Sequence, residues 1–130
     1  MALFDQVIAT DLLALILNDS AFSAVTATNI LLGTNTPSAI VNMTQLGGGT
    51  GYTTGGSSIT WNAASAGATS NSNMISWTNS GSAWSLAGLE IWNSGATVRY
   101  LFGTWTGQPV NVNTGNTFQV AIAGISVSLV

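Results

Sequence analysis

The chain has 130 residues and a net charge of −3, and only five residues are charged: Asp5, Asp11, Asp19, Glu90 and Arg99. Because Lys, His and Cys do not occur, the groups used for acid–base catalysis, nucleophilic triads and structural zinc sites are missing. We therefore expect no enzymatic activity, no cofactor and no bound metal. A single cation cannot neutralise a row of phosphates, which argues against nucleic acid as a partner.

The length predicts a single domain over residues 1–130, because a chain of this size buries about two-thirds of its unfolded surface. We divide it into an N-terminal arm and helix over 1–24 and a β-sandwich over 28–130. The apolar run Leu12–Leu17 is shorter than the roughly 20 residues that cross a bilayer, and no basic segment precedes it as in a signal peptide. The expectation is a soluble, unprocessed protein that does not enter a membrane.

The surface is predicted to carry small uncharged polar groups instead of charges. Thr, Ser, Asn and Gly together make up 59 of the 130 residues, yet 46% of the chain is hydrophobic, which supplies material for a core. A surface without Lys lacks the usual protection of strand edges against association. We expect much of this surface to contact partners, including further copies of the chain.

The N-terminal segment begins with an apolar arm, Met1-Ala2-Leu3-Phe4, which is a candidate contact segment. Residues 5–18 then predict a helix, with Asp5 as N-cap and Asn18 at the C-terminal end. Its apolar stripe consists of Ile8, Leu12, Leu15 and Ile16, and a second strip of Leu13 and Leu17. This helix packs either on its own domain or on a neighbouring protein.

After Ser23 the pattern changes to short β-type runs separated by Gly, Asn and Ser, which is typical of antiparallel sandwiches and barrels. The predicted fold class is mainly β, a single-domain antiparallel β-sandwich or barrel-like fold with one N-terminal α-helix. The segment 47–56 predicts a flexible Gly-rich loop without a phosphate-binding motif. A β-bulge near Ala123-Gly124 is expected, because the apolar parity changes there. Strands are predicted at Thr28–Gly33, Ser57–Asn62, Met74–Trp77, Ser85–Trp92, Thr97–Trp105, Val110–Val112 and Thr117–Val130.

One hairpin can be given a register from the sequence. A turn at Ser94-Gly95 would pair Asn93 with Ala96 and place Glu90 directly opposite Arg99. One face of this hairpin would then be apolar through the pairs Ile91–Val98, Leu89–Tyr100 and Ala87–Phe102. A three-residue loop with a bulge would instead set Glu90 against Val98, so the charge pair favours the first register.

The other face of the hairpin would carry Glu90 and Arg99 together with Trp84, Trp92 and Trp105. Three interpretations remain open for it. In the first, the ion pair is a surface contact that contributes about 0–1 kcal/mol. In the second, the face is a protein interface, since Trp and Arg anchor such contacts. In the third, a second sheet covers the face and the Trp residues belong to the core. Trp61 and Trp77 are expected in the core. The candidate partner-contact residues are Met1, Leu3, Phe4, Trp84, Trp92, Trp105, Glu90 and Arg99.

The order of several segments resembles a family of small virion proteins of tailed bacteriophages, over about residues 10–129. These segments are the Leu-rich DLLALILND, the strand ILLGTNTP, the loop GGGTGY, the segment SITWNAASAGATSNSNMISW, the hairpin LEIWNSG…YLFGTW and the ending VNTGNTFQVAIAGISVSL. The chain departs from the family in having fewer charges and no His before Gly88-Leu89. Members are described as tail fibre or minor tail proteins, and some resemble capsid decoration proteins; no catalytic residues come with the resemblance.

The resemblance implies a structural protein of the virion, with the phage major capsid protein or other virion proteins as partners. A capsid decoration protein that stabilises the head lattice is expected, because the chain is too short to build both a fibre shaft and a tip. The alternative is a tail-associated adhesin that binds host glycans through Trp84, Trp92, Trp105 and Tyr52. A glycosidase would need two placed carboxylates, whereas only Glu90 lies in the predicted sheet region.

Overall fold

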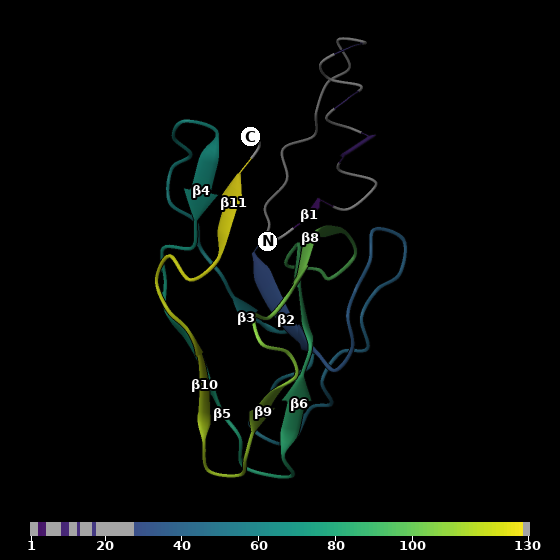
Figure 1. Ribbon diagram of the computed structural model, residues 1–130, viewed down its shortest axis with the longest axis vertical. Coiled ribbons are helices and arrows are strands. Elements are labelled where there is room, and N and C mark those ends of the chain that lie inside the picture. The colour runs from purple at the N-terminus through teal and green to yellow at the C-terminus, as the bar shows by residue number, and fades with distance from the viewer. Residues whose placement is uncertain (1–2, 5–8, 11–12, 14–16, 18–27, 129–130) are drawn as a thin grey trace.

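The computed structural model describes residues 3–4, 9–10, 13, 17 and 28–128. Within them the chain is built from short antiparallel strands (Figure 1). Their bounds are β1 Leu3–Phe4, β2 Asn29–Gly33, β3 Ser57–Ser58, β4 Ala68–Ser70, β5 Ile75–Thr78, β6 Trp84–Leu86, β7 Gly88–Trp92, β8 Arg99–Thr104, β9 Val110–Val112, β10 Thr117–Val120 and β11 Ser126–Ser128. The prediction of a mainly β, antiparallel sandwich or barrel-like fold is confirmed.

The largest sheet has five strands in the order β1-β8-β7-β2-β3. A sheet with one exposed face has alternating buried and exposed residues along each strand. The central strands lack this alternation, since every residue of β2 from Ile30 to Gly33 and of β7 from Gly88 to Ile91 is buried. One face of these strands packs into the core through Ile30 and Ile91, which are paired across the ladder. The other face must therefore also be covered.

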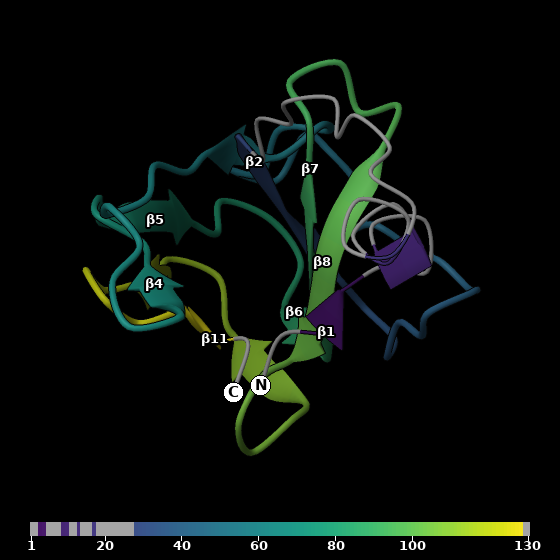
Figure 2. The same cartoon turned by 90° about the horizontal axis from the view of Figure 1, so that it is seen from above.

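Three two-stranded ladders complete the fold, β5 with β10, β4 with β11 and β6 with β9. Figures 1 and 2 place the β4–β11 and β5–β10 ladders on one side of the molecule and the large sheet on the other. A single hydrophobic cluster joins these ladders, because it contains Ile30 of β2, Ile75 of β5, Leu86 of β6 and Val127 of β11. Trp77 is buried and Trp61 packs against the cluster, which confirms the core role predicted for both.

The predicted register of the 85–105 hairpin is wrong. Leu89 pairs with Gly103 and Ile91 with Leu101, so the ladder is shifted by three residues and Glu90 lies opposite Phe102. The connection is longer than the predicted two-residue turn, because the Asn93 side-chain oxygen accepts hydrogen bonds from the amides of Thr97 (2.8 Å) and Val98 (3.2 Å). A bulge between Ile91 and Trp92 then brings Trp92 opposite Arg99.

Two predicted strands are each divided in the structure. Residues 85–92 form β6 and β7, which belong to different sheets, and residues 117–128 form β10 and β11, which pair with β5 and β4. A turn at 121–124, in which Gly124 N donates to Ala121 O, takes the place of the expected bulge. The fully buried Asn71 holds this turn through its side chain, since Nδ2 donates to Ala121 O and Oδ1 accepts from Ile125 N.

The remaining predictions concern the strand at 57–62 and the N-terminal helix. The strand is reduced to β3 at Ser57–Ser58, and β4 lies in a segment to which the sequence assigns no strand. The helix over 5–18 lies largely outside the described residues; of its positions, Leu13 and Leu17 are exposed. Within the residues that the structure describes, no helix is long and apolar enough to cross a membrane.

A candidate partner-binding loop over the large sheet

The second face of the large sheet is covered by the loop of residues 34–44, which we call the anchored loop. It leaves β2 at Thr34 and returns at Thr44, where Thr34 N donates to Thr44 O over 3.0 Å. Asn35 closes the same neck, because its side-chain oxygen accepts from Thr44 N over 2.5 Å. At the tip, Ser38 N donates to Val41 O over 2.9 Å, which makes a tight turn.

Two glycines allow the anchored loop to lie directly on the sheet. Gly33 of β2 and Gly88 of β7 are paired across the ladder, and both are buried. A Cβ added at Gly33 would lie 2.2 Å from the sulfur of Met43, and one at Gly88 would lie 2.5 Å from Cδ of Pro37 and 2.7 Å from Asn35 O. Side chains on this face would thus displace the loop.

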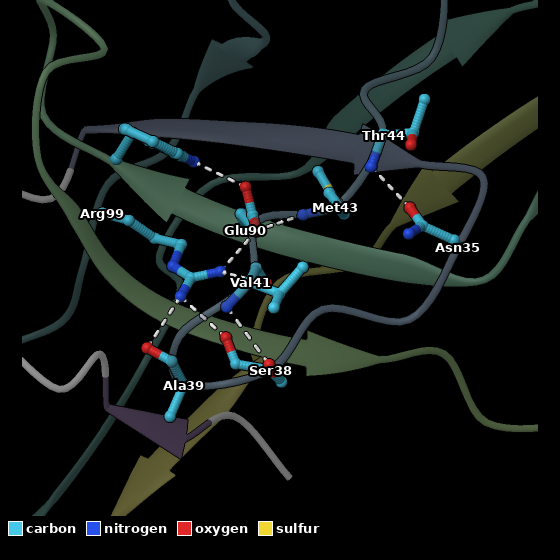
Figure 3. Close-up of polar contacts among 9 residues, drawn as sticks. Asn35, Ser38, Ala39, Val41, Met43, Thr44, Glu90 and Arg99 are labelled. Carbon is cyan, nitrogen blue, oxygen red and sulfur yellow. Dashed lines mark hydrogen bonds and ion pairs between the residues drawn. The ribbon is translucent and has the colours of Figure 1, made fainter.

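An ion pair between Glu90 and Arg99 fastens the loop to the sheet (Figure 3). Arg99 Nη1 lies 2.7 Å from Glu90 Oε1, and both side chains are buried, with 3% and 2% of their surface exposed. The pair was predicted as directly opposed residues on a face that was open, at an interface or covered; the structure shows a buried, diagonal contact, since Glu90 is opposite Phe102.

The polar atoms of the pair hold the loop backbone. Arg99 Nη1 donates to Val41 O over 3.0 Å, and Nη2 donates to Ser38 O and Ala39 O over 2.7 and 3.2 Å. Glu90 Oε1 accepts from Met43 N over 2.7 Å. The guanidinium also lies over the Phe102 ring, with Cζ 5.1 Å from its centroid. Buried ions need such partners to offset the loss of hydration, and here the partners are mainly loop peptide groups.

The tip of the anchored loop presents apolar side chains to solvent. Ile40 is 78% exposed and Val41 is 55% exposed, although the carbonyls of Ala39 and Val41 on either side of Ile40 accept hydrogen bonds from Arg99. Ordered loops usually expose polar residues, and exposed apolar groups can mark contact sites. Chemically, the tip offers a small apolar projection whose backbone is already fixed and loses little entropy when a partner binds it.

Three of the predicted contact residues are buried within the chain. Trp84 is 3% exposed, Glu90 1% and Arg99 5%, so the expected open face carrying them does not exist. Trp84 donates through Nε1 to Thr50 Oγ1 over 3.0 Å and belongs to the core, as one of the alternatives held. Glu90 and Arg99 therefore do not contact a partner directly; they hold the anchored loop in position.

Trp92 and Trp105 are half-buried, and their indole N–H groups are bound within the chain. Trp92 Nε1 donates to Glu90 Oε2 over 3.0 Å, and Trp105 Nε1 donates to Gly88 O over 3.1 Å. The ring of Trp105 meets that of Phe118 edge-on, with centroids 5.0 Å apart. These two residues keep part of their surface available for a partner.

The N-terminal candidates fall at the edge of the large sheet. Leu3 and Phe4 form β1, which pairs with β8 (Figure 2). Met1 lies outside the described residues. β8 thus contributes both Arg99, which holds the anchored loop, and the residues paired with β1, while Trp92 lies opposite Arg99.

Tyr52, a candidate for stacking on sugars, is buried in the core with 2% of its surface exposed. Its hydroxyl oxygen accepts from Leu32 N over 3.2 Å and from Gln45 Nε2 over 2.8 Å. Burial raises the pKa of this hydroxyl above its ordinary value of 10.0, and the two hydrogen bonds oppose that change. Tyr52 thus fixes the Gly-rich segment 47–56 against β2.

Sequence reasoning missed the anchored loop as a site. Apolar residues do not recur at a regular spacing within residues 34–44, so the pattern predicts only a connection between strands. The signal that was available is the pair of glycines, one in each of two strands that otherwise consist of large residues, together with Pro37 in the segment between them. A glycine in such a strand indicates that another backbone approaches closely.

No family of known proteins matches the chain, and no curated protein sequence matches it. Across the described residues there is also no group of three or more His, Cys, Asp and Glu side chains that could hold a metal ion.

Proposed function

We propose that this protein is a structural component of a tailed-bacteriophage particle and decorates the capsid. The observation that carries the proposal is the anchored loop, an apolar tip that is held rigidly by a buried ion pair on an almost uncharged domain. The order of sequence segments resembles that of small phage virion proteins. This resemblance is the reason for placing the protein on a phage particle. The partner is then the major capsid protein, contacted at repeated sites on the head.

The mechanism would be mechanical stabilisation by burial. Ile40 and Val41 present apolar surface to a neighbouring protein, and full burial of such a side chain contributes about 1.5–3 kcal/mol before association costs. Because the loop is anchored by Arg99, little ordering entropy is lost on contact. Two side chains alone would bind weakly, so further contacts through the half-buried Trp92 and Trp105 would be needed at each site.

The alternative, a tail adhesin that stacks sugars on aromatic rings, retains fewer residues. Tyr52 and Trp84 are buried in the core and present no ring face to a ligand. Trp92 and Trp105 remain, each partly covered. The side chains of Ile40 and Val41 carry no hydrogen-bonding group for a sugar hydroxyl, so protein contact is the better use of these two residues.

The experiment is an add-back assay with particles assembled without this protein. Purified chain is mixed with the particles and the fraction that sediments with them is measured. We expect the wild-type chain to bind, and the variant Ile40→Ser/Val41→Ser to lose at least tenfold in affinity. The matched control is Met74→Ser, since Met74 is 59% exposed but directly precedes β5, which pairs with β10 and not with the strands under the loop. Equal binding of both variants would exclude the tip as the contact, and no sedimentation of the wild-type chain would contradict the capsid role.

A further inference from the structure

The carboxylate of Glu90 holds the anchored loop with one oxygen and binds a tryptophan with the other. Oε1 accepts from Met43 N and from Arg99 Nη1, each over 2.7 Å (Figure 3). Oε2 accepts from Trp92 Nε1 over 3.0 Å. The terminal torsion of a glutamate side chain has only broad preferences, so these hydrogen bonds decide how the carboxylate plane is turned. A turn of the plane would move Oε1 away from both of its donors at once.

The indole that binds Oε2 belongs to the sheet and not to the loop. Glu90 and Trp92 are two residues apart in β7, and this spacing places both side chains on one face of a strand. The main chain of Trp92 pairs with Asn29 of β2, and its carbonyl accepts from Thr28 N over 2.9 Å. On the other side of β7, Trp92 lies opposite Arg99. Two neighbouring strands therefore fix the donor to Oε2.

Exposure separates Trp92 from the ions that it lies beside. Glu90 is 1% exposed and Arg99 is 5% exposed, so a partner cannot reach either of them. Trp92 is half-buried, and of these three side chains it is the one that reaches the surface. Its hydrogen bond thus begins a path that runs from the surface through the two ions to the loop carbonyls of Ser38 and Val41.

We propose that Trp92 is a positioning residue for the tip of the anchored loop, and that it acts by fixing the carboxylate of Glu90. The carboxylate in turn holds Met43 N and aligns the guanidinium of Arg99 on the loop carbonyls. A buried carboxylate oxygen without a donor is costly, so loss of the indole N–H lets the carboxylate turn toward other donors and loosens the loop. The inference rests on the proposed function only in treating the tip as a contact site.

The experiment is hydrogen exchange of the full chain carrying Trp92→Phe, which keeps an aromatic ring and removes the indole N–H. We expect the Met43 amide to exchange at least tenfold faster, relative to the amides of β5 and β10, than it does in the wild-type chain. Those strands pair with each other in a separate ladder and report on general destabilisation. The matched control is Trp84→Phe, which removes an indole N–H bound to Thr50 Oγ1 and should not raise this ratio.

A background without the ion pair shows whether Trp92 acts through Glu90. In Glu90→Leu/Arg99→Met the carboxylate is absent, so adding Trp92→Phe should change the relative exchange of the Met43 amide by less than twofold. A tenfold increase in that background would overturn the proposal, because Trp92 would then act by another route. An unchanged ratio in the single variant, or an equal rise in Trp84→Phe, would overturn it as well.

A measurement on the wild-type chain covers the case in which Trp92→Phe does not fold. The indole N–H of Trp92 should exchange at least tenfold more slowly than that of free tryptophan, because it is bound to Glu90 Oε2. Exchange as fast as in free tryptophan would contradict the proposed role. None of these measurements involves a capsid, so the positioning role and the capsid contact can fail separately.

Discussion

At the scale of single residues, the Glu90–Arg99 pair is the costliest feature of the chain. Removing two ions from water costs several kcal/mol each, and their attraction offsets this only when the remaining polar atoms are also bound. Here Glu90 accepts from Met43 N and Trp92 Nε1, and Arg99 donates to three loop carbonyls. Two of the chain's five charged residues therefore serve to place the anchored loop.

We predict that Arg99→Met lowers the free energy of unfolding by about 3–5 kcal/mol, because it leaves the Glu90 carboxylate buried without its cation. The double variant Glu90→Leu/Arg99→Met should recover only part of that loss, because it removes the buried unpaired charge but leaves Met43 N and the loop carbonyls without their partners. Urea unfolding of the three proteins measures both effects. A loss below about 1 kcal/mol in the single variant would contradict the burial of the pair.

Hydrogen exchange separates loop anchoring from stability in the same variants. The amide of Met43 donates to Glu90 Oε1 and should be protected in the wild-type chain. In the double variant this amide should exchange faster, even where part of the stability is restored, because no acceptor remains. Amides of β5 and β10, which lie in another ladder, serve as the internal control.

Because of Tyr52, we predict that the stability of the fold decreases at alkaline pH. Its raised pKa means that the folded state favours the neutral hydroxyl. Its contribution to stability is complete below the ordinary pKa of 10.0 and is lost as the pH rises through the higher folded value. We expect Tyr52→Phe to be less stable at neutral pH by about 1–3 kcal/mol, since Leu32 N and Gln45 lose their acceptor.

The same variant should lose less stability than the wild-type chain as the pH rises above 10.0, because the titrating group is gone. Thermal unfolding at a series of pH values measures this difference. Parallel decreases in the two proteins would show that Tyr52 is not the group responsible.

At the scale of elements, the fit between the anchored loop and the sheet depends on Gly33 and Gly88. We predict that Gly88→Ala lowers the free energy of unfolding by about 1–3 kcal/mol, because its Cβ would meet the rigid Pro37 ring and a backbone carbonyl. Gly33→Ala should cost less, since the Met43 side chain that it meets can turn aside. Chemical denaturation of the two variants tests the order, and a greater loss for Gly33→Ala would contradict it.

The sequence predicted most β positions because their apolar residues alternate or cluster between turn residues. The strands at 29–33, 75–78 and 110–112 agree with the prediction within one residue. The hairpin register could not be obtained in this way. It depends on the Asn93 side chain, which binds two amides, and on Ala96 in the left-handed region with φ of 50°. Neither feature alters the apolar pattern from which the register was inferred.

The candidate site was predictable only in part. The association of Glu90 with Arg99 followed from their opposite charges in one hairpin. Their burial did not, because it requires the segment 34–44 to fold back across β7 and β8. Such a long-range contact leaves no periodic signal, and neither Ile40 nor Val41 stands out in a sequence with many apolar residues.

At the scale of the whole molecule, one core joins all the ladders and leaves a surface of small polar groups with few apolar projections. Among the described residues, the large exposed apolar side chains are Leu13, Leu17, Ile40, Val41, Met74 and Ile122. The anchored tip gathers two of them on adjacent positions. This arrangement is consistent with the proposed contact through the tip of the anchored loop.

The most direct test of the proposed role is the copy number of this protein in purified phage particles, measured by quantitative mass spectrometry against the major capsid protein. A capsid decoration protein should be present in hundreds of copies, in a fixed ratio to the capsid protein. A handful of copies would place it on the tail and favour the adhesin. Its absence from the particles would contradict a structural role in the virion.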